Sequence, residues 1–566
     1  MTTSTGAEVV ADVLAAHGVS AVFSLPGVQL DSLHAALTAR APSIRLINAR
    51  HEQGAAFMAF GYAQASGELG VLMVVPGPGL LNAGTALATA WACNTPLLCI
   101  VGQADSRLAD RGWGAHHEVP RQREMIGHVC KWSRTVTDAR EIAPLLLEAI
   151  HEAHAGRPRP VLLELPVDIA ATAVETDVRA AAPKEGVASK PDAVLVAAAS
   201  ALLREAKRPL IIAGGGCANA PDQVRALAHA LGAPVMMTTN GRGTLNDDDP
   251  LAMGSLEGHV LWGNADVVLA LGTRMFWPLA IWKHRAAGMR LVRVDIDAEQ
   301  IGKPVASELA IVADVAPTVM ALLEGCGRDA PPSETWPREE LRSLRRRVAE
   351  QIAGLHPQAD YCAVLERELP AGAVVVADST QLGYYATTAL PIRRPRELVT
   401  AGFQGTLGFA LPAALGARFA NPSREVLAII GDGGFQFCVS ELATARQYGV
   451  KVIVVLVNDC AYGEVVRLQT ERFGYALPGA TLLNPDFSAL VASFGLSASL
   501  VTTPDELTNA LREALRSDVT SVIEVRADAM PSLWNLMPPA HVTERRTEEP
   551  GRRSLFGSRS IAAGRP

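Results

Sequence analysis

The chain has 566 residues, of which 49% are hydrophobic, and a formal net charge of −7. Its length suggests roughly three or four domains. The sequence has no basic stripe and no cluster of aromatic and arginine residues, so we do not expect a nucleic acid as a partner. Eight scattered cysteines with no C-x-x-C pair argue against a zinc ribbon or a disulfide framework and favour a reducing compartment, so we expect a cytoplasmic protein.

Short apolar runs alternate with helical patterns along three successive blocks of the chain. Such alternation predicts an α/β fold with three consecutive doubly wound parallel-sheet domains. We place these domains at residues 1–180, 190–335 and 355–545. The clearest strand candidates are residues 71–75, 97–101, 161–165, 209–213, 267–271, 291–296, 374–377, 426–430 and 452–457.

Stretches of different composition separate or end these blocks. Residues 180–192 are rich in Ala, Pro and Lys and indicate a linker. The second block ends near a polar stretch at 329–334. Residues 546–566 are rich in Arg, Gly and Ser, and we expect this tail to be disordered.

The stretch between Glu68 and Asp105 contains no charged residue and is long enough to cross a bilayer. Its prolines and glycines would break a spanning helix. We therefore expect a strand, a glycine-proline loop, a buried helix and a second strand, with no membrane insertion. The N-terminus also lacks the basic flank and apolar run of a secretory signal.

Two strands of the third block run into loops with acidic residues. The strand expected at 426–430 is followed by Gly431-Asp432-Gly433-Gly434, and the strand expected at 452–457 by Asn458-Asp459. Loops at the carboxyl ends of parallel strands meet at one edge of the sheet, so both side chains are able to bind one ion. Oxygen ligands beside a glycine-rich, phosphate-binding turn are typical of Mg²⁺. An ordinary strand-to-helix turn is the alternative on these residues alone.

The spacing of 27 residues from Asp432 to Asp459 resembles the signature of thiamine diphosphate (thiamine pyrophosphate) enzymes, in which Gly-Asp-Gly is followed by two Asn. This resemblance implies that Asp432, Asp459 and the carbonyl of Ala461 bind the metal. The chain departs from the signature because Asp459 stands where Asn is usual, which adds a negative charge and bears on the choice of metal. The resemblance also implies cofactor contacts by Gly431, Gly433, Gly434, Tyr462 and Gly463.

A second match lies in the first block. Residues 48–59, Asn-Ala-Arg-His-Glu-Gln-Gly-Ala-Ala-Phe-Met-Ala, closely resemble the acetolactate synthase motif around the catalytic glutamate, here Glu52. By this resemblance Glu52 bonds the aminopyrimidine ring of the cofactor and promotes loss of the thiazolium proton. The small residues at 54–56 would let a ring approach the helix start closely. The alternative for Glu52 is an acid at a helix N-terminus that the helix dipole stabilises.

The resemblance extends over roughly residues 5–540 and implies pyrimidine-binding, central and diphosphate-binding domains in that order. Pro76, in the run Pro-Gly-Pro-Gly, continues the match in the first block and is implied to contact the cofactor. The carbonyl of Gly405 is implied to bond the exocyclic amine of the cofactor. Leu407 stands where this family places a bulky apolar wedge between the two cofactor rings.

Two polar residues stand at positions that line the substrate pocket in this family. His117 lies in a segment that carries a Phe and a Gln in the acetolactate synthases, and it is a candidate acid–base or carboxylate-binding residue, with a hydrogen-bonded structural histidine as the alternative. Glu464 follows the metal loop, where relatives mostly carry an apolar residue. It is a candidate proton donor or a partner for a cationic substrate end, and a capping or solvated role is equally open.

We therefore expect a thiamine-diphosphate- and Mg²⁺-dependent enzyme, similar to acetolactate synthase, that decarboxylates a 2-oxo acid. The product is then protonated or joined to an aldehyde or a second 2-oxo acid. A flavin-dependent oxidase of the same fold and a non-catalytic paralogue are the alternatives. The glycines at 214–216 do not complete G-x-G-x-x-G, so FAD is not favoured. The family shares its cofactor site between two subunits, which implies a homodimer or a dimer of dimers (homotetramer).

Overall fold

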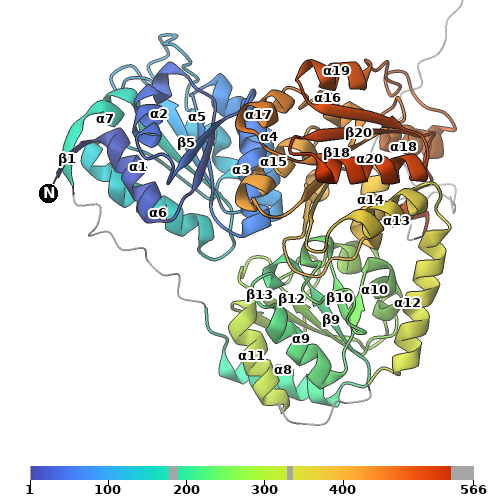
Figure 1. Ribbon diagram of the computed structural model, residues 1–566. Coiled ribbons are helices and arrows are strands. Elements are labelled where there is room, and N and C mark those ends of the chain that lie inside the picture. The colour runs from blue at the N-terminus through green and yellow to red at the C-terminus, as the bar shows by residue number, and fades with distance from the viewer. Residues whose placement is uncertain (1, 177–188, 283, 328–334, 537–566) are drawn as a thin grey trace, which may run out of the picture.

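The computed structural model describes residues 2–176, 189–282, 284–327 and 335–536 (Figure 1). Most of the predicted linker at 180–192, the whole polar stretch at 329–334 and the whole predicted tail at 546–566 lie outside these residues. The domain boundaries therefore stay predictions.

Three six-stranded parallel sheets confirm the predicted fold class. Each predicted apolar run coincides with a strand to within two residues at either end. Strands of a parallel sheet are covered on both faces by helices, so their sequences are continuous apolar runs rather than alternating ones.

The N-terminal sheet has the strand order β3-β2-β4-β5-β7-β6, and β1 and β8 pair separately as an antiparallel ribbon. Its elements in chain order are β1 (Thr2–Thr5), α1 (Gly6–Ala16), β2 (Ala21–Ser24), α2 (Asp31–Thr38), β3 (Arg45–Asn48), α3 (Glu52–Ser66), β4 (Gly70–Val74), α4 (Pro78–Cys93), β5 (Leu97–Gln103), α5 (Gln122–Ile126), β6 (Trp132–Thr135), α6 (Ile142–His154), β7 (Pro160–Pro166), α7 (Val167–Ala171) and β8 (Ala173–Thr176).

The central sheet has the order β11-β10-β9-β12-β13-β14. Numbered within the domain this is 3-2-1-4-5-6, the order of dinucleotide-binding folds. Its elements are α8 (Ala193–Glu205), β9 (Pro209–Ala213), α9 (Pro221–Leu231), β10 (Val235–Met237), β11 (Ala252–Met253), α10 (Ser255–Trp262), β12 (Val267–Leu271), β13 (Arg290–Asp295), β14 (Leu309–Val312) and α11 (Val315–Cys326), and α12 (Arg338–Ala353) leads to the next domain.

The C-terminal sheet has the order β16-β15-β17-β18-β20-β19. Its elements are α13 (Gln358–Glu368), β15 (Val374–Ala377), α14 (Gln381–Ala389), β16 (Leu398–Thr400), α15 (Ala410–Ala420), β17 (Val426–Gly431), α16 (Asp432–Gln436), α17 (Glu441–Tyr448), β18 (Ile453–Asn458), α18 (Gly463–Phe473), α19 (Phe487–Ser493), β19 (Ser497–Val501), α20 (Pro504–Arg516) and β20 (Ser521–Arg526).

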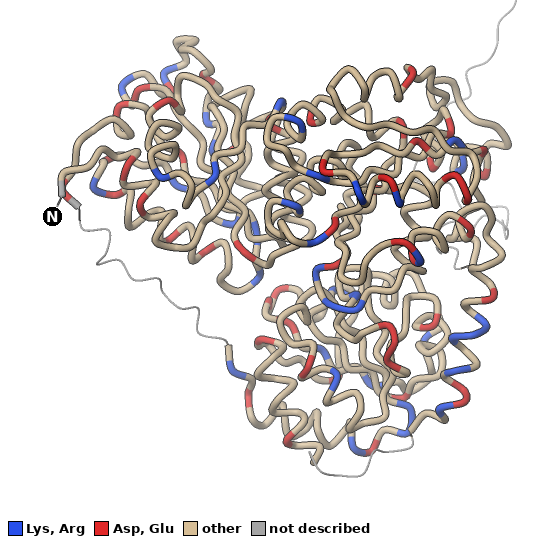
Figure 2. Tube along the Cα trace, viewed as in Figure 1, with Lys and Arg blue, Asp and Glu red and all other residues tan. Residues whose placement is uncertain are grey.

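The uncharged stretch between Glu68 and Asp105 forms β4, a turn, α4 and β5, as predicted, and most of it is buried. Among the described residues, no helix has both the length and the apolarity needed to cross a membrane. Basic and acidic residues are interspersed along the described chain in all three domains, as α12 illustrates (Figure 2).

Helices α3 and α15 join the N-terminal and C-terminal domains (Figure 1). They approach closely because each has a glycine at the contact. A Cβ atom on Gly61 would lie 2.0 Å from the carbonyl oxygen of Ala413, and one on Gly416 would lie 1.9 Å from that of Met58. Residues of both domains form one hydrophobic core around this contact, so the interface between the two domains is buried and apolar.

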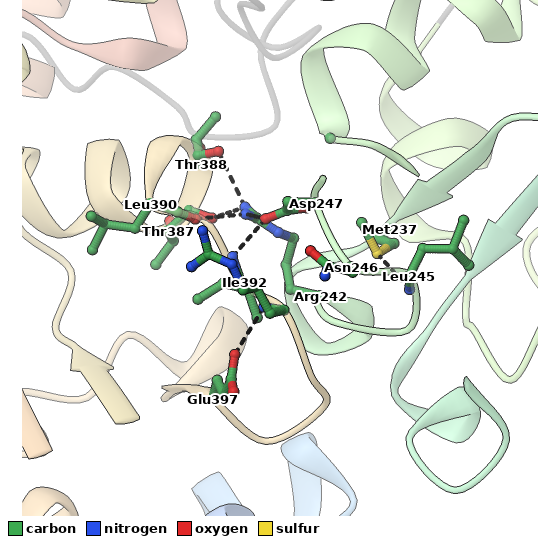
Figure 3. Close-up of polar contacts among 12 residues, drawn as sticks. Met237, Arg242, Leu245, Asn246, Asp247, Thr387, Thr388, Leu390, Ile392 and Glu397 are labelled. Carbon is green, nitrogen blue, oxygen red and sulfur yellow. Dashed lines mark hydrogen bonds and ion pairs between the residues drawn. The ribbon is translucent and has the colours of Figure 1, made fainter. Parts of the chain in front are cut away.

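Arg242 joins the central and C-terminal domains (Figure 3). Its guanidinium donates to the backbone carbonyls of Thr387 at 2.6 Å and Leu390 at 2.8 Å, and it pairs with Asp247 at 2.5 Å. A positive charge at the C-terminal end of α14 is favourable because the helix dipole is negative there. The contact fixes α14, whose first residue is Gln381.

Candidate active site

Two acidic side chains follow the neighbouring parallel strands β17 and β18. Asp432 is the first residue of α16 and is buried, and Asp459 comes directly after β18. Burial raises the pKa of both carboxyl groups, and the charge of Asp432 helps to raise that of Asp459 to about 6. A buried carboxylate and a half-buried one that repel each other favour a bound cation, and their hard oxygen atoms fit Mg²⁺.

Asn484 belongs to the same cluster, although no sequence pattern indicated it. Its amide donates to Asp432 Oδ2 at 2.6 Å and to Asn458 Oδ1 at 2.9 Å. Asn458 in turn donates to Glu524 at 2.7 Å. The side chain of Asn458, the first residue of the Asn-Asp pair, is therefore hydrogen-bonded to other side chains of the protein. Asp459, in contrast, accepts only the N–H of Ala461, at 3.2 Å, among the described groups.

Two glycines of the predicted site are required by close packing. A Cβ atom on Gly433 would lie 2.5 Å from the ring of Tyr462, so this tyrosine covers the glycine-rich turn. A Cβ atom on Gly463 would lie 2.3 Å from Asp459 Oδ2. Residues from the loops after β17 and β18 thus pack directly on one another. This is what a single metal site formed by both loops, as predicted from the sequence, requires.

Asp378 is a further buried acidic residue, and it lies next to the glycine-rich turn after β17. Gly431 caps α16, and a Cβ atom on Gly434 in that helix would lie 2.8 Å from Asp378 Oδ2. Burial raises the pKa of Asp378 to about 7. No sequence pattern indicated Asp378, because it follows a different strand, β15, and no motif includes it.

The loop before α15 lies against the start of α3. Gly405 has φ +55°, a left-handed conformation that favours glycine. Leu407 is 38% exposed, and its carbonyl accepts a hydrogen bond from the Gln53 side chain at 3.4 Å. Since Gln53 follows Glu52, the loop predicted to support the bent cofactor adjoins the helix that carries the predicted catalytic acid.

Glu52 is the first residue of α3 and is 7% exposed. Its Oε2 accepts a hydrogen bond from Asn82 Nδ2 at 3.0 Å, and Asn82 belongs to α4, which begins just after Pro76. The helix is capped by His51, whose ring accepts the N–H of Gln53 at 3.1 Å, so His51 has a structural role. The carboxyl group is therefore held at a fixed place beside the turn that contains Pro76.

His117 lies near Glu52. Burial and the neighbouring His116 lower the pKa of His117, whereas the charge of Glu52 raises it. The two histidine rings stack with their centroids 3.9 Å apart, and among the described residues Nδ1 of His117 has no hydrogen-bond partner. The backbone of His117 packs on the predicted cofactor turn, because a Cβ atom on Gly77 would lie 2.4 Å from its carbonyl oxygen. The ring of His117, with a buried Nδ1 that has no partner among the described residues, thus lies close to the predicted catalytic acid.

Glu464 lies in the first turn of α18 and is bound to other side chains of the protein. Arg467 pairs with its two oxygens at 2.5 and 3.0 Å, and Gln381 donates to it at 2.6 Å. Arg467 also pairs with Glu471 at 2.6 Å, so the three charged groups carry a net negative charge.

Three consecutive stretches of the sequence match thiamine pyrophosphate enzymes: residues 4–125 the N-terminal TPP binding domain, 196–322 the central domain, and 378–525 the C-terminal TPP binding domain. The chain is 35% identical to a probable 2-ketoarginine decarboxylase of Pseudomonas aeruginosa over 93% of this chain and 94% of the relative. It is 32% identical to the acetolactate synthase isozyme 1 large subunit of Escherichia coli over 94% and 96% of the two chains. A probable acetolactate synthase 2 of rice is 33% identical over 92% and 82%.

These relatives align with nearly the whole chain, and the matched domains include Glu52, Asp432 and Asp459. The buried glutamate at the start of α3 and the oxygen atoms of Asp432 and Asp459 fit a cofactor with a ring system at one end and a diphosphate at the other. The chain belongs to the family of thiamine pyrophosphate enzymes.

Proposed function

We propose that this enzyme decarboxylates a 2-oxo acid and releases the product as an aldehyde or joins it to a second carbonyl compound. The observation that carries the proposal is the pairing, in one chain, of the buried Glu52 with the oxygen-donor pair of Asp432 and Asp459. The names of the relatives, a 2-ketoarginine decarboxylase and acetolactate synthases, support it.

The chain's own residues have the following proposed roles. Asp432, Asp459 and the carbonyl of Ala461 hold Mg²⁺, and Glu52 holds and moves a proton at the pyrimidine end of the cofactor. When bound, thiamine diphosphate supplies the electron sink that lets the carboxyl group leave as CO2. The carbonyl of Gly405 and the side chain of Leu407 orient the cofactor rings. The remaining proposed cofactor contacts are Pro76, Gly431, Gly433, Gly434, Tyr462 and Gly463.

The test is a screen of 2-oxo acids, including 2-ketoarginine and small aliphatic acids, for CO2 release with mass analysis of the products. The protein is first freed of cofactor with a chelator. We expect at least one acid to release CO2 only when both thiamine diphosphate and Mg²⁺ are added back. If no acid releases CO2 although the cofactor binds, the proposal is wrong.

A flavin-dependent oxidase of the same fold is the second candidate, because the central sheet has the strand order of dinucleotide-binding folds. A bound yellow chromophore that a 2-oxo acid bleaches would favour it. A colourless protein that releases CO2 would favour the decarboxylase.

A change at His117 or Glu464 should alter turnover or substrate choice but not cofactor affinity. His117 adjoins Glu52, and Glu464 stands in the turn after the metal loop. Exchange of either for Gln keeps the size, and a lost acid–base role typically costs about 10²–10⁴-fold in rate. Steady-state kinetics with several 2-oxo acids is the measurement. Wild-type constants in both variants would exclude these residues from the site.

We further propose that the enzyme is a homodimer or a dimer of dimers with a shared site. Mixed oligomers test this: one chain carries Glu52→Gln and the other Asp432→Ala, each with its own affinity tag. If the site is built from two chains, isolated mixed dimers have one intact site and regain about half of the wild-type rate. If each site lies within a single chain, the mixed dimers stay inactive.

A cytoplasmic location is also part of the proposal. All eight cysteines are free thiols, as a reducing compartment favours.

A further inference from the structure

The segment that leads into the catalytic helix α3 is held by side chains of another domain. The backbone N–H of Asn48 donates to the Tyr448 hydroxyl at 2.8 Å. The N–H groups of Arg50 and His51 donate to Glu441 Oε1 at 3.1 and 3.0 Å. Tyr448 and Glu441 are the last and first residues of α17, so one helix of the C-terminal domain binds three N–H groups just before Glu52.

Glu441 is buried and oriented by its surroundings. It is 1% exposed, and the Thr444 hydroxyl donates to its Oε2 at 2.6 Å. A Cβ atom on Gly54 would lie only 2.2 Å from Glu441 Oε1. We expected small residues at 54–56 to admit a cofactor ring, and the structure gives a different reason at position 54: only glycine leaves room for this carboxylate.

The chemistry of Glu441 suits a positioning role. A carboxylate accepts two backbone N–H groups and a hydroxyl at once, and hydrogen bonds to an ionised group are roughly twice as strong as neutral ones. A negative charge beside the N-terminus of α3 is also favourable with respect to the helix dipole. The place of the first helical residue, Glu52, is therefore set in part by Glu441.

We propose that Glu441 is a positioning residue for the reaction: its carboxylate fixes the start of α3, so that the Glu52 carboxyl group meets the pyrimidine nitrogen of the cofactor. Glu441 follows the helix that begins with Asp432, so within one chain the stretch that carries the proposed metal ligand also holds the segment before Glu52, whichever chain completes the site that this Glu52 serves. This inference rests on the proposed function, because it assigns Glu441 to the activation of thiamine diphosphate.

The test compares Glu441→Gln with a matched control, Glu397→Gln. Glu397 is likewise a buried carboxylate of the C-terminal domain that accepts two backbone N–H groups, from Arg393 at 2.8 Å and Arg394 at 3.0 Å, but it lies near Arg242 at the central-domain contact (Figure 3). The readout is the rate at which the C2 proton of bound thiamine diphosphate exchanges with deuterium. We expect Glu441→Gln to slow exchange by about 10- to 10²-fold, since small misplacements of reacting groups cost this much.

Thermal melting shows whether each variant folds. Thr444→Val is the milder second variant, because it removes only the hydroxyl that orients the carboxylate, and we expect it to slow exchange by a smaller factor. Steady-state kinetics should show a lower kcat with little change in KM in both variants, whereas Glu397→Gln should exchange at the wild-type rate even if it melts earlier. Wild-type exchange in Glu441→Gln and Thr444→Val with the cofactor bound would overturn the positioning role. If the wild type itself does not accelerate exchange, the proposed function fails instead.

Discussion

Replacement of Glu52 by glutamine is expected to lower turnover by about 10²-fold or more, while the fold and cofactor binding persist. Glutamine keeps the shape and is still able to accept the hydrogen bond from Asn82, but it has no carboxyl proton to exchange with the cofactor. The measurement is CO2 release at saturating thiamine diphosphate and Mg²⁺, with bound cofactor quantified in the same sample.

The matched control is Glu68→Gln, which makes the same change on an exposed residue just beyond the end of α3. We expect wild-type turnover there. Undiminished turnover in Glu52→Gln would mean that another group activates the cofactor.

The second large effect is expected at Asp459. Asp459→Ala should weaken the binding of Mg²⁺ and thiamine diphosphate by at least about 10–10²-fold, the loss typical even for a group that only supports a metal ligand. Asp459→Asn should retain binding, because an amide oxygen also coordinates Mg²⁺, and it removes the repulsion from Asp432. Calorimetric titration of chelator-treated protein measures both affinities.

The control for Asp459 is Asp505→Ala, which removes an exposed carboxylate from α20 of the same domain. It should bind the cofactor as the wild type does. If Asp459→Ala binds equally well, Asp459 is not a metal ligand, and Asp432 with the neighbouring amide oxygens would have to hold the ion.

The strands were predictable from the sequence because the sheets are parallel. The runs at 209–213, 267–271 and 374–377 coincide with β9, β12 and β15, since strands covered on both faces by helices contain few polar residues. The order of strand, turn, helix and strand in the uncharged stretch between Glu68 and Asp105 was also predictable, because its prolines and glycines mark the turn before α4.

The site was predictable only where its residues are close in sequence. Asp432 and Asp459 stand in loops after adjacent strands, so their motifs indicate a common place. Asn484, which donates to Asp432, and Glu441, which holds the segment before Glu52, are far from their partners along the chain. Such contacts arise from tertiary packing, and no local pattern encodes them.

Glu464 illustrates a different limit of prediction from the sequence. The sequence places it in the turn after the metal loop, but it does not reveal that Arg467 and Gln381 bind its carboxylate. The spacing from Glu464 to Arg467 permits a helical ion pair, which was one signal for such a role. Whether the substrate also contacts this pair is tested by the Glu464→Gln kinetics.

The exchange of the C2 proton of bound thiamine diphosphate with deuterium tests most directly that Glu52 activates the cofactor. NMR after a rapid acid quench measures its rate. We predict that the wild-type protein exchanges this proton much faster than free thiamine diphosphate does, and that Glu52→Gln, with the cofactor demonstrably bound, exchanges it about 10²-fold more slowly than the wild type. Equal exchange rates in the wild type and in cofactor-bound Glu52→Gln would contradict the assignment of Glu52.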